Sequence, residues 1–417
     1  MKALALSFLE RVLPRGASAL IVLLLAAALP PSVVGLYSAV IIAVTLVQSI
    51  SDGAVRQIAV SAIDSVEGRD FLRRYSVLTA VIGGMTILVA CLLVIWLNPG
   101  LAPQAWTLLP LALVPTFAAM RVESLAIMQS ASRWRYLARA QLVASSGSLL
   151  VSIGLLWFTQ SLVAATVQAL LTEVVFTAQV RRSARVTAVP PRPHGDQDVR
   201  SYGREFGHLS LYASLAWLQS QADRVLLLML GGTGRLGLFS LSWSLSRAGS
   251  DALSASTANV ARPYLLRDGD TKRFTSTVER ALLVQAVIWI LTVAGASVLV
   301  APILGPEWAP AIAAVPVLTL SGFSSVVEWS VTIAMVANSR IKWASPIKGV
   351  GVLMAVPIAL VAVHDLWLAS WLVVARECIV MVLMTFVTMG PARRACAVAL
   401  GLTAVGAALA LAIEVWT

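Results

Sequence analysis

The sequence has few charged residues for its length. Only 12% of its 417 residues are charged, 59% are hydrophobic, and the mean hydropathy is +0.85. A water-soluble protein of this length has no core large enough to hide so much apolar surface. The scarcity of charge excludes a soluble globular protein and predicts a membrane protein.

Cysteine and histidine are also scarce, with three of each. Cys91, Cys378 and Cys396 lie in or beside apolar runs and show no CxxC spacing, so neither a disulfide framework nor a thiolate metal site is predicted. The histidines are scattered, and we find no nucleotide-binding glycine loop, GxSxG motif or paired catalytic carboxylates in an extramembrane loop. The sequence therefore predicts no catalytic residue, no metal and no resident cofactor.

What the sequence has in abundance is apolar runs of about 20 residues, the length that crosses the hydrocarbon layer as a helix. The alternating pattern of an outer-membrane barrel is absent, and only helices or closed barrels satisfy their own backbones in lipid. We expect an all-α polytopic membrane bundle. It would have about thirteen spans, centred near residues 22, 43, 86, 117, 148, 170, 217, 245, 290, 322, 352, 377 and 405.

The net charge of +11 comes largely from basic links between these spans. If the N-terminus is cytoplasmic, the cytoplasmic links include VEGRDFLRR, SRWRYLAR and PARR, whereas the opposite links include NPG and FTQS. This asymmetry follows the positive-inside rule, so we expect a cytoplasmic N-terminus. Because the basic residues lie beside spans, they do not indicate a nucleic-acid partner.

A weak internal repeat divides the chain. Gly-Leu-aromatic-Ser occurs at 35–38 and again 202 residues later at 237–240, and VESLAIMQSASRW resembles VEWSVTIAMVANSRIKW, with Glu123 and Glu328 in register. Six crossings return a chain to its starting side, so the copies have the same orientation, as in transporters built from parallel repeats. We expect two six-helix lobes, at residues 1–180 and 206–388, joined by a cytoplasmic linker at residues 181–205. An accessory C-terminal helix would follow at residues 389–417.

Several ionisable residues fall at membrane depth, where each central one costs roughly 2.5 to 3.5 kcal/mol. Asp52 with Arg56, and Arg247 with Asp251, have the i,i+4 spacing of a pair on one helix. Other neighbours are one or two residues apart and point away from each other, so we expect them to find partners on other helices or in an aqueous cavity between the lobes. For any single residue, a structural ion pair between helices is the alternative. These neighbours are Asp223 with Arg224, Arg376 with Glu377, and Arg121 with Glu123.

Two stretches carry a resemblance to a known family, GLYSAVIIAVTLVQSISDGAVRQ and QADRVLLLMLGGTGRLGLFSLSWSLSR. They resemble the polysaccharide exporters of the multidrug/oligosaccharidyl-lipid/polysaccharide (MOP) superfamily, which are flippases of undecaprenyl-linked O-antigen and exopolysaccharide. Ala222-Asp223-Arg224 followed by a second Gly-Leu-aromatic-Ser, and GPEWAPAI after residue 304, occur in the family's order. The family's Asp-Gly ending is shortened here, with Arg56 as the counterpart of its arginine.

The resemblance implies two lobes that form a V, as in MATE transporters, and open alternately to either side of the bacterial inner membrane. It implies a lipid pyrophosphate bearing a short glycan as cargo, with membrane lipids and polysaccharide assembly proteins as partners. Arginine forks onto phosphate oxygens, so the expected pyrophosphate contacts are arginines. Carboxylates would bind a coupling proton or Na⁺. The arginines are Arg56, Arg224 and Arg247, then Arg121 and Arg376, and the carboxylates are Asp223, Glu123, Glu328 and Glu173.

Other functions remain open at this point. A multidrug cation antiporter of the same superfamily would favour an acidic, aromatic pocket, whereas arginines are at least as frequent as acids here. A flippase of the peptidoglycan precursor is chemically similar. A membrane polysaccharide polymerase or ligase needs a large external loop, and the outer links predicted here are a few residues long.

Overall fold

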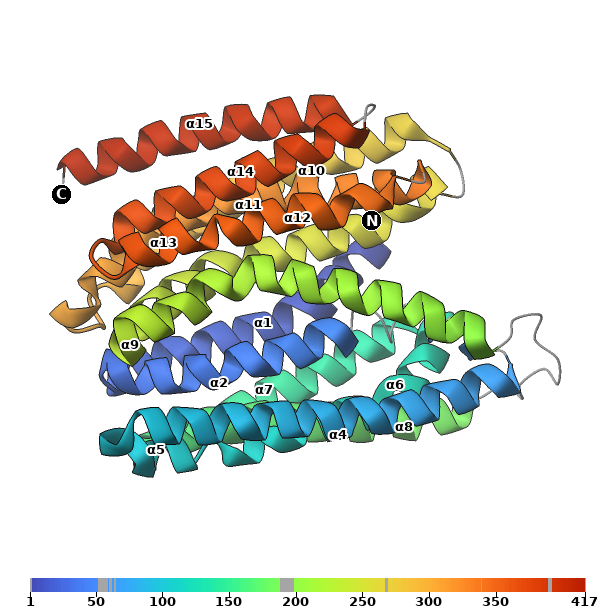
Figure 1. Ribbon diagram of the computed structural model, residues 1–417, viewed down its shortest axis with the longest axis horizontal. Coiled ribbons are helices and arrows are strands. Elements are labelled where there is room, and N and C mark those ends of the chain that lie inside the picture. The colour runs from blue at the N-terminus through green and yellow to red at the C-terminus, as the bar shows by residue number, and fades with distance from the viewer. Residues whose placement is uncertain are drawn as a thin grey trace. The chain divides into compact units, whose positions relative to one another are not determined.

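The computed structural model describes residues 2–51, 59, 62–63, 65–131, 133–187, 199–266, 269–338, 340–388 and 392–416, and almost all of them are helical (Figure 1). The predicted all-α membrane bundle is confirmed. Short 3₁₀ or π turns join several helices. The α-helices are α1 (Lys2–Ala28), α2 (Pro31–Ile50), α4 (Val66–Leu97), α5 (Ala102–Trp106), α6 (Val114–Ser130), α7 (Trp134–Thr159), α8 (Val163–Thr187), α9 (Val199–Leu266), α10 (Thr271–Gly295), α11 (Ala309–Ala337), α12 (Ala344–Leu353), α13 (Ala355–Ala362), α14 (Leu366–Thr388) and α15 (Ala392–Trp416).

Within the described residues, eleven helical stretches are long and apolar enough to cross a membrane. One of them, residues 213–262 of α9, covers two predicted spans, because the helix is interrupted at Gly232, where φ is 72°. Such a positive φ is a conformation that glycine adopts without steric cost. A shorter apolar segment, Val12–Ala28, lies in α1, and each of the thirteen predicted span centres falls within a helix.

Spatial proximity divides the chain into two compact units. Unit 1 comprises residues 1–35 and 219–417, and unit 2 comprises residues 36–218. These units are not the predicted lobes, whose boundaries stay a prediction. The predicted linker at 181–205 overlaps the end of α8 and the start of α9, and its centre lies outside the described residues.

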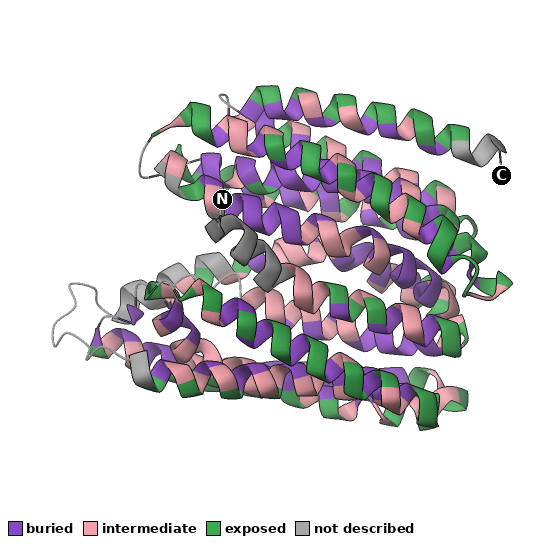
Figure 2. Ribbon diagram, turned by 180° about the vertical axis from the view of Figure 1, so that it is seen from behind, coloured by how far each residue is buried: buried purple, intermediate pink, exposed green. Residues whose placement is uncertain are grey.

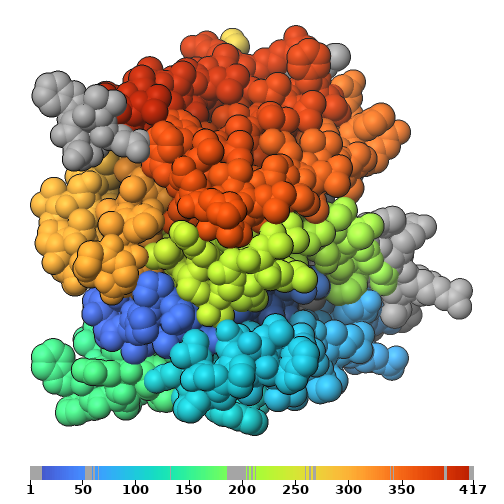
Figure 3. All heavy atoms as spheres, turned by 60° about the vertical axis from the view of Figure 1, so that its left-hand side comes forward, coloured from blue at the N-terminus to red at the C-terminus, as the bar shows by residue number. Residues whose placement is uncertain are grey.

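Unit 1 is built around α11, which packs against α10, α14 and α15. Twenty of the 29 residues of α11 are buried, so this helix forms the interior of the unit. In the space-filling view, the side chains of residues 300–390 form one continuous packed mass (Figure 3). The accessory helix predicted at the C-terminus is α15, and Gly406 lets it approach Leu320 of α11 closely.

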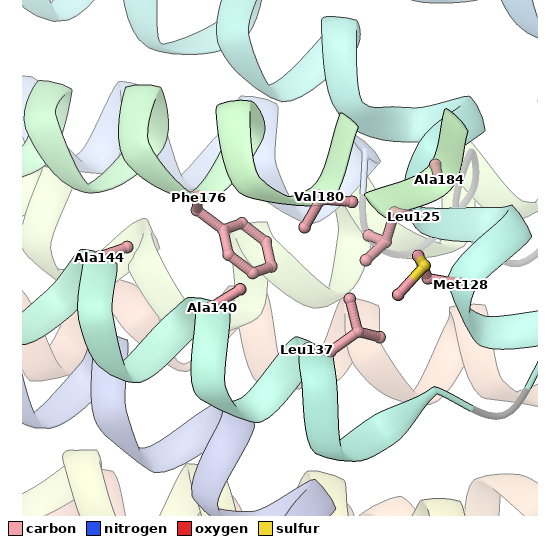
Figure 4. Packing of buried hydrophobic residues seen from close by; sticks show 8 residues of the cluster. All are labelled: Leu125, Met128, Leu137, Ala140, Ala144, Phe176, Val180 and Ala184. Carbon is pink, nitrogen blue, oxygen red and sulfur yellow. The ribbon is translucent and has the colours of Figure 1, made fainter. Parts of the chain in front are cut away.

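Unit 2 has a conventional apolar interior. Eight side chains of α6, α7 and α8 pack together, including Leu137, Phe176 and Val180 (Figure 4). A second cluster joins α4 to α6, and the ring of Tyr75 of α4 lies tilted against Phe206 in the first residues of α9, with 4.0 Å between the ring centroids. Polar contacts also join these helices, among them the 2.6 Å hydrogen bond between Ser148 and Thr172.

Many positions along the helices are exposed (Figure 2), and a large share of them are large apolar residues. Trp157 and Phe158 are 82% and 85% exposed, and Leu291, Leu353 and Phe386 are also exposed. A soluble monomer rarely exposes so large an apolar area, whereas lipid solvates it. The surface agrees with the multi-pass membrane protein that the sequence predicts.

The two copies of the repeated Gly-Leu-aromatic-Ser motif contact each other through their glycines. A Cβ placed on Gly35 would overlap the carbonyl of Thr233, and a Cβ placed on Gly237 would overlap the carbonyl of Pro31. Thr233 follows Pro31 by the same 202 residues by which Gly237 follows Gly35. The contact is therefore reciprocal, as in an isologous interface between identical partners.

Candidate functional site

The first pair of predicted site residues, Asp223 and Arg224, is buried on α9, nine and eight residues before the interruption at Gly232. Asp223 Oδ1 accepts the backbone N–H of Arg224 at 2.9 Å. The Arg224 guanidinium donates to Gln221 Oε1 at 2.7 Å and to Ser240 Oγ at 3.0 Å. Because Ser240 follows the interruption, Arg224 ties the two arms of α9 together.

Arg376 of α14 connects that helix to α9. Its guanidinium is fully buried and donates to Asp223 Oδ2 at 3.2 Å, which is the partner on another helix that the sequence predicts. It also donates from Nε to Glu377 Oε1 at 3.1 Å. The expectation that Arg376 and Glu377 cannot pair on their own helix is therefore wrong. Neighbouring Cβ atoms do diverge, but the long arginine side chain curves back to reach the adjacent carboxylate.

Two more ion pairs lie in the same unit. The predicted i,i+4 pair is confirmed, with Arg247 Nη2 at 2.8 Å from Asp251 Oδ1. Arg247 also donates to Ser321 of α11 at 2.9 Å and lies over the Trp243 ring. Glu328 of α11 pairs with Lys348 of α12 in the interior.

These eight residues form what we call the ionic cluster. Glu377 interacts electrostatically with Arg247 and Lys348 as well as with Arg376, so the separate ion pairs are electrostatically coupled to one another. Asp251 has the most exposed side chain among the paired members, at 33%, so the ionic cluster reaches the protein surface at the Arg247–Asp251 pair. With four basic and four acidic groups its formal charge is zero, which lowers the cost of burying it. The members are Asp223, Arg224, Arg247, Asp251, Glu328, Lys348, Arg376 and Glu377.

Arg224 differs from the other cations of the ionic cluster. Within the described part of the chain, no carboxylate oxygen lies within 4.0 Å of its guanidinium, and its Nε has no hydrogen-bond partner. Neutral Gln221 and Ser240 hold the group instead. A guanidinium held by neutral partners keeps its charge available for an anion, whereas the charge of Arg376 is already divided between two carboxylates.

The other predicted residues lie in unit 2. Arg121 pairs with Glu173, Nη2 donating to Oε1 at 3.4 Å, and lies over the Phe176 ring. Glu123 lies 3.6 Å from Arg73, whose side chain is largely exposed. The structure therefore places Arg121 and Glu123 with partners on other helices, as predicted. Arg56 and Asp52 lie outside the described residues.

Sequence reasoning missed Lys348 and Ser240 as neighbours of the site. Lys348 gave a signal, because it is one of four lysines in the chain and lies within a predicted apolar span. Ser240 gave none, since its proximity to Arg224 depends on the backbone turn at Gly232.

Comparison with known proteins agrees with this architecture. The model of a family described as "Polysaccharide biosynthesis protein" matches residues 24–313, most of the chain. The chain belongs to this family. The match includes Asp223, Arg224, Arg247 and Asp251 of the ionic cluster, whereas Glu328, Lys348 and the Arg376–Glu377 pair lie beyond it. Among curated protein sequences no match was found.

Solved structures similar to this member of the polysaccharide biosynthesis family include MATE transporters and a lipid II flippase, and the family match and this shared fold together confirm the predicted resemblance. An outward-facing multidrug resistance MATE transporter is 17% identical, with a TM-score of 0.62, and the alignment covers 92% of this chain and 94% of that one. The lipid II flippase MurJ, in an inward closed conformation, is 11% identical, with a TM-score of 0.63 and coverage of 96% and 91%. These likenesses show that the chain has the MATE and MurJ fold.

Proposed function

We propose that this protein flips an undecaprenyl-pyrophosphate-linked oligosaccharide across the bacterial inner membrane by alternating access. The cargo would serve O-antigen or exopolysaccharide biosynthesis, and the N-terminus would be cytoplasmic. The family description and the transporter fold support the class of function. A polysaccharide precursor that crosses a membrane on a lipid carrier bears a diphosphate, so its transporter needs cations at membrane depth.

The observation that carries this proposal is the environment of Arg224. Its guanidinium is buried, held by neutral Gln221 and Ser240, and has an unpartnered Nε. We assign Arg224 as the main pyrophosphate contact and Arg247, at the edge of the ionic cluster, as the second. Since Arg224 is 6% exposed, the surrounding helices must separate before the cargo reaches it, as alternating access requires.

The remaining arginines receive different roles in the proposal. Arg376 is a positioning residue, because it holds Asp223 on α9 against α14. Arg121, paired with Glu173 in unit 2, would join the cargo contacts only after that pair opens. Arg56 stays a predicted contact outside the described residues.

The energy source would be a proton or Na⁺ that moves down its gradient, since the sequence contains no ATP site. Glu328 and Asp223 are the strongest candidates to bind the coupling ion. Each is buried and pairs with one basic side chain on a neighbouring helix, Glu328 with Lys348 and Asp223 with Arg376. Glu123 and Glu173 of unit 2 are weaker candidates. In proteoliposomes, Glu328→Gln and Asp223→Asn should each alter the dependence of transport on a pH or Na⁺ gradient, and an unchanged dependence in both would remove the coupling assignment.

The main test is Arg224→Ala. Loss of a charged hydrogen-bonding group costs about 1.5 to 3 kcal/mol, so export should fall about 10- to 100-fold while the protein still inserts. The measurement is movement of a fluorescent lipid-linked oligosaccharide in proteoliposomes, together with accumulation of lipid-linked glycan in cells. Arg280→Ala, which removes an exposed arginine of α10, is the matched control and should export normally.

Two results would contradict the assignment. Normal export by Arg224→Ala would remove Arg224 from the cargo site. Gradient-driven movement of a cationic dye, without movement of the lipid-linked oligosaccharide, would favour a multidrug antiporter.

A further inference from the structure

One end of unit 2 carries exposed arginines on two neighbouring helices. Arg135 and Arg139 are exposed near the start of α7, and Arg182 and Arg185 are exposed near the end of α8. The Tyr136 hydroxyl of α7 donates to the Gln179 carbonyl of α8 at 3.0 Å, so these helix ends lie side by side. We call Arg135, Arg139, Arg182 and Arg185 the arginine patch.

The arginine patch has no acidic partner in the described part of the chain. No carboxylate lies within 4.0 Å of these four guanidinium groups. Two acids of unit 2 pair with other arginines, Glu173 with Arg121 and Glu123 with Arg73. The four positive charges are therefore available to an anion from outside the chain.

The position of the arginine patch relative to the bilayer follows from α7. The exposed stripe that holds Arg135 and Arg139 continues at helical spacing through Leu142, Leu150 and Trp157. From residue 139 to residue 157 the helix rises about 27 Å, close to the roughly 30 Å of hydrocarbon in a bilayer. A lipid-facing stripe of this length, with arginines at one end and tryptophan at the other, places the arginines at the level of the phosphates.

The chemistry of the side chains points to phosphate as the anion. No lysine occurs between residues 36 and 218, so every basic group in this unit other than histidine is an arginine. Arginine presents paired donors that fit two phosphate oxygens, whereas lysine offers a point charge. Arg135 and Arg139 are one helical turn apart, so both guanidinium groups can reach one headgroup.

We propose that the arginine patch binds the headgroups of anionic phospholipids from the surrounding bilayer. An acidic protein or an RNA would meet these charges from the water, whereas the arginines continue a stripe that faces lipid. This site is separate from the ionic cluster, and the proposal does not depend on the transported cargo. Bound anionic lipids would fix the depth of α7 and α8 in the membrane.

Unit 1 supplies a matched control, because two of its exposed arginines already have acids. Arg273 lies 3.3 Å from Asp270, and Arg394 lies 2.8 Å from Glu279. Both arginine side chains are more than two thirds exposed. Removing them subtracts the same net charge as removing two members of the arginine patch.

The test is a titration of the purified full chain in a neutral detergent with fluorescent phosphatidylglycerol, with phosphatidylcholine as the reference lipid. Native mass spectrometry counts the bound lipids. Each arginine near an anionic headgroup contributes about a fivefold gain in affinity, so Arg135→Gln with Arg139→Gln should weaken phosphatidylglycerol binding about 30-fold. The control, Arg273→Gln with Arg394→Gln, should change it less than twofold. Arg135→Lys with Arg139→Lys should give an intermediate loss, because the charge remains and the fork is lost.

Three outcomes would overturn the proposal. One is equal loss in the patch variant and the control, which would indicate attraction by net charge alone. Another is equal affinity for phosphatidylglycerol and phosphatidylcholine. The third is displacement of the lipid by millimolar inorganic phosphate, which would indicate a site for free phosphate. If the α7 variant fails to fold, Arg182→Gln with Arg185→Gln tests the same patch from α8.

Discussion

The two units differ in where their charged side chains lie. Unit 1 holds a neutral set of four cations and four acids among α9, α11, α12 and α14, and six of these eight side chains are buried. In the described part of unit 2, the largely buried ion pair is Arg121 with Glu173, while Arg135, Arg139 and their neighbours on α8 lie exposed at one end. The proposed cargo contacts Arg224 and Arg247 thus lie in unit 1, and the proposed lipid contacts lie at the exposed end of unit 2.

The comparison is sharpest at the two carboxylates that the repeat places in register. Glu123 of α6 pairs with Arg73, whose side chain is largely exposed, whereas Glu328 of α11 pairs with buried Lys348. Five residues of α6 are buried, against twenty of α11. Similar sequences thus occupy different depths, so a repeat in the sequence does not imply a repeated function.

Removal of Arg376 should have the largest effect on stability. Arg376→Met leaves Asp223 and Glu377 buried without their cation, which should cost about 3 to 5 kcal/mol of unfolding free energy. Arg121→Met leaves one partly accessible carboxylate, Glu173, and should cost less. Unfolding of both variants in detergent, followed by circular dichroism, makes the measurement.

Removing the two carboxylate charges as well should restore the stability that Arg376→Met loses. Arg376→Met combined with Asp223→Asn and Glu377→Gln removes the stranded charges and should recover most of the lost stability. Equal losses for Arg376→Met and Arg121→Met, or no recovery in the triple variant, would show that the ionic cluster is not a stabilising unit.

The reciprocal glycine contact should respond equally from either copy of the repeat. Gly35→Ala and Gly237→Ala each push a methyl group against a backbone carbonyl, which should cost about 1 to 3 kcal/mol. Gly147→Ala is the control, because nothing lies within 4 Å of its added Cβ, and alanine should gain up to about 1 kcal/mol in this helix. A large loss at one repeat glycine and none at the other would contradict the reciprocity, as read from melting temperatures.

The exposed pair of unit 2 should give the smallest effect. Arg73→Gln removes the partner of Glu123 where the arginine is 67% exposed, so unfolding free energy should change by less than about 1 kcal/mol. Lys348→Met, which strands Glu328 in the interior, should cost several times more. A double-mutant cycle on each pair compares the two coupling energies directly, and similar values would remove the distinction between the units.

The sequence predicts the helices and part of the charged site. Apolar runs of membrane-spanning length locate all thirteen span centres, and the i,i+4 rule finds Arg247 with Asp251. The bridge from Arg376 to Asp223 joins residues 153 positions apart, so helix periodicity could only require a partner without identifying it.

The errors have equally specific causes. The Cβ geometry that separates Arg376 from Glu377 does not limit a guanidinium that lies several bonds farther out. The role of Ser240 depends on one backbone conformation at Gly232, which has no counterpart in apolar periodicity.

The mutual approach of Gly35 and Gly237 has a consequence for the residues tolerated at both positions. Residues 31–35 and 233–237 touch as two copies of one surface would across a twofold axis, each offering a carbonyl to the gap left by the other's missing side chain. Because the two gaps face each other, a side chain at either glycine would push residues 31–35 away from residues 233–237 and disturb both halves of the contact at once.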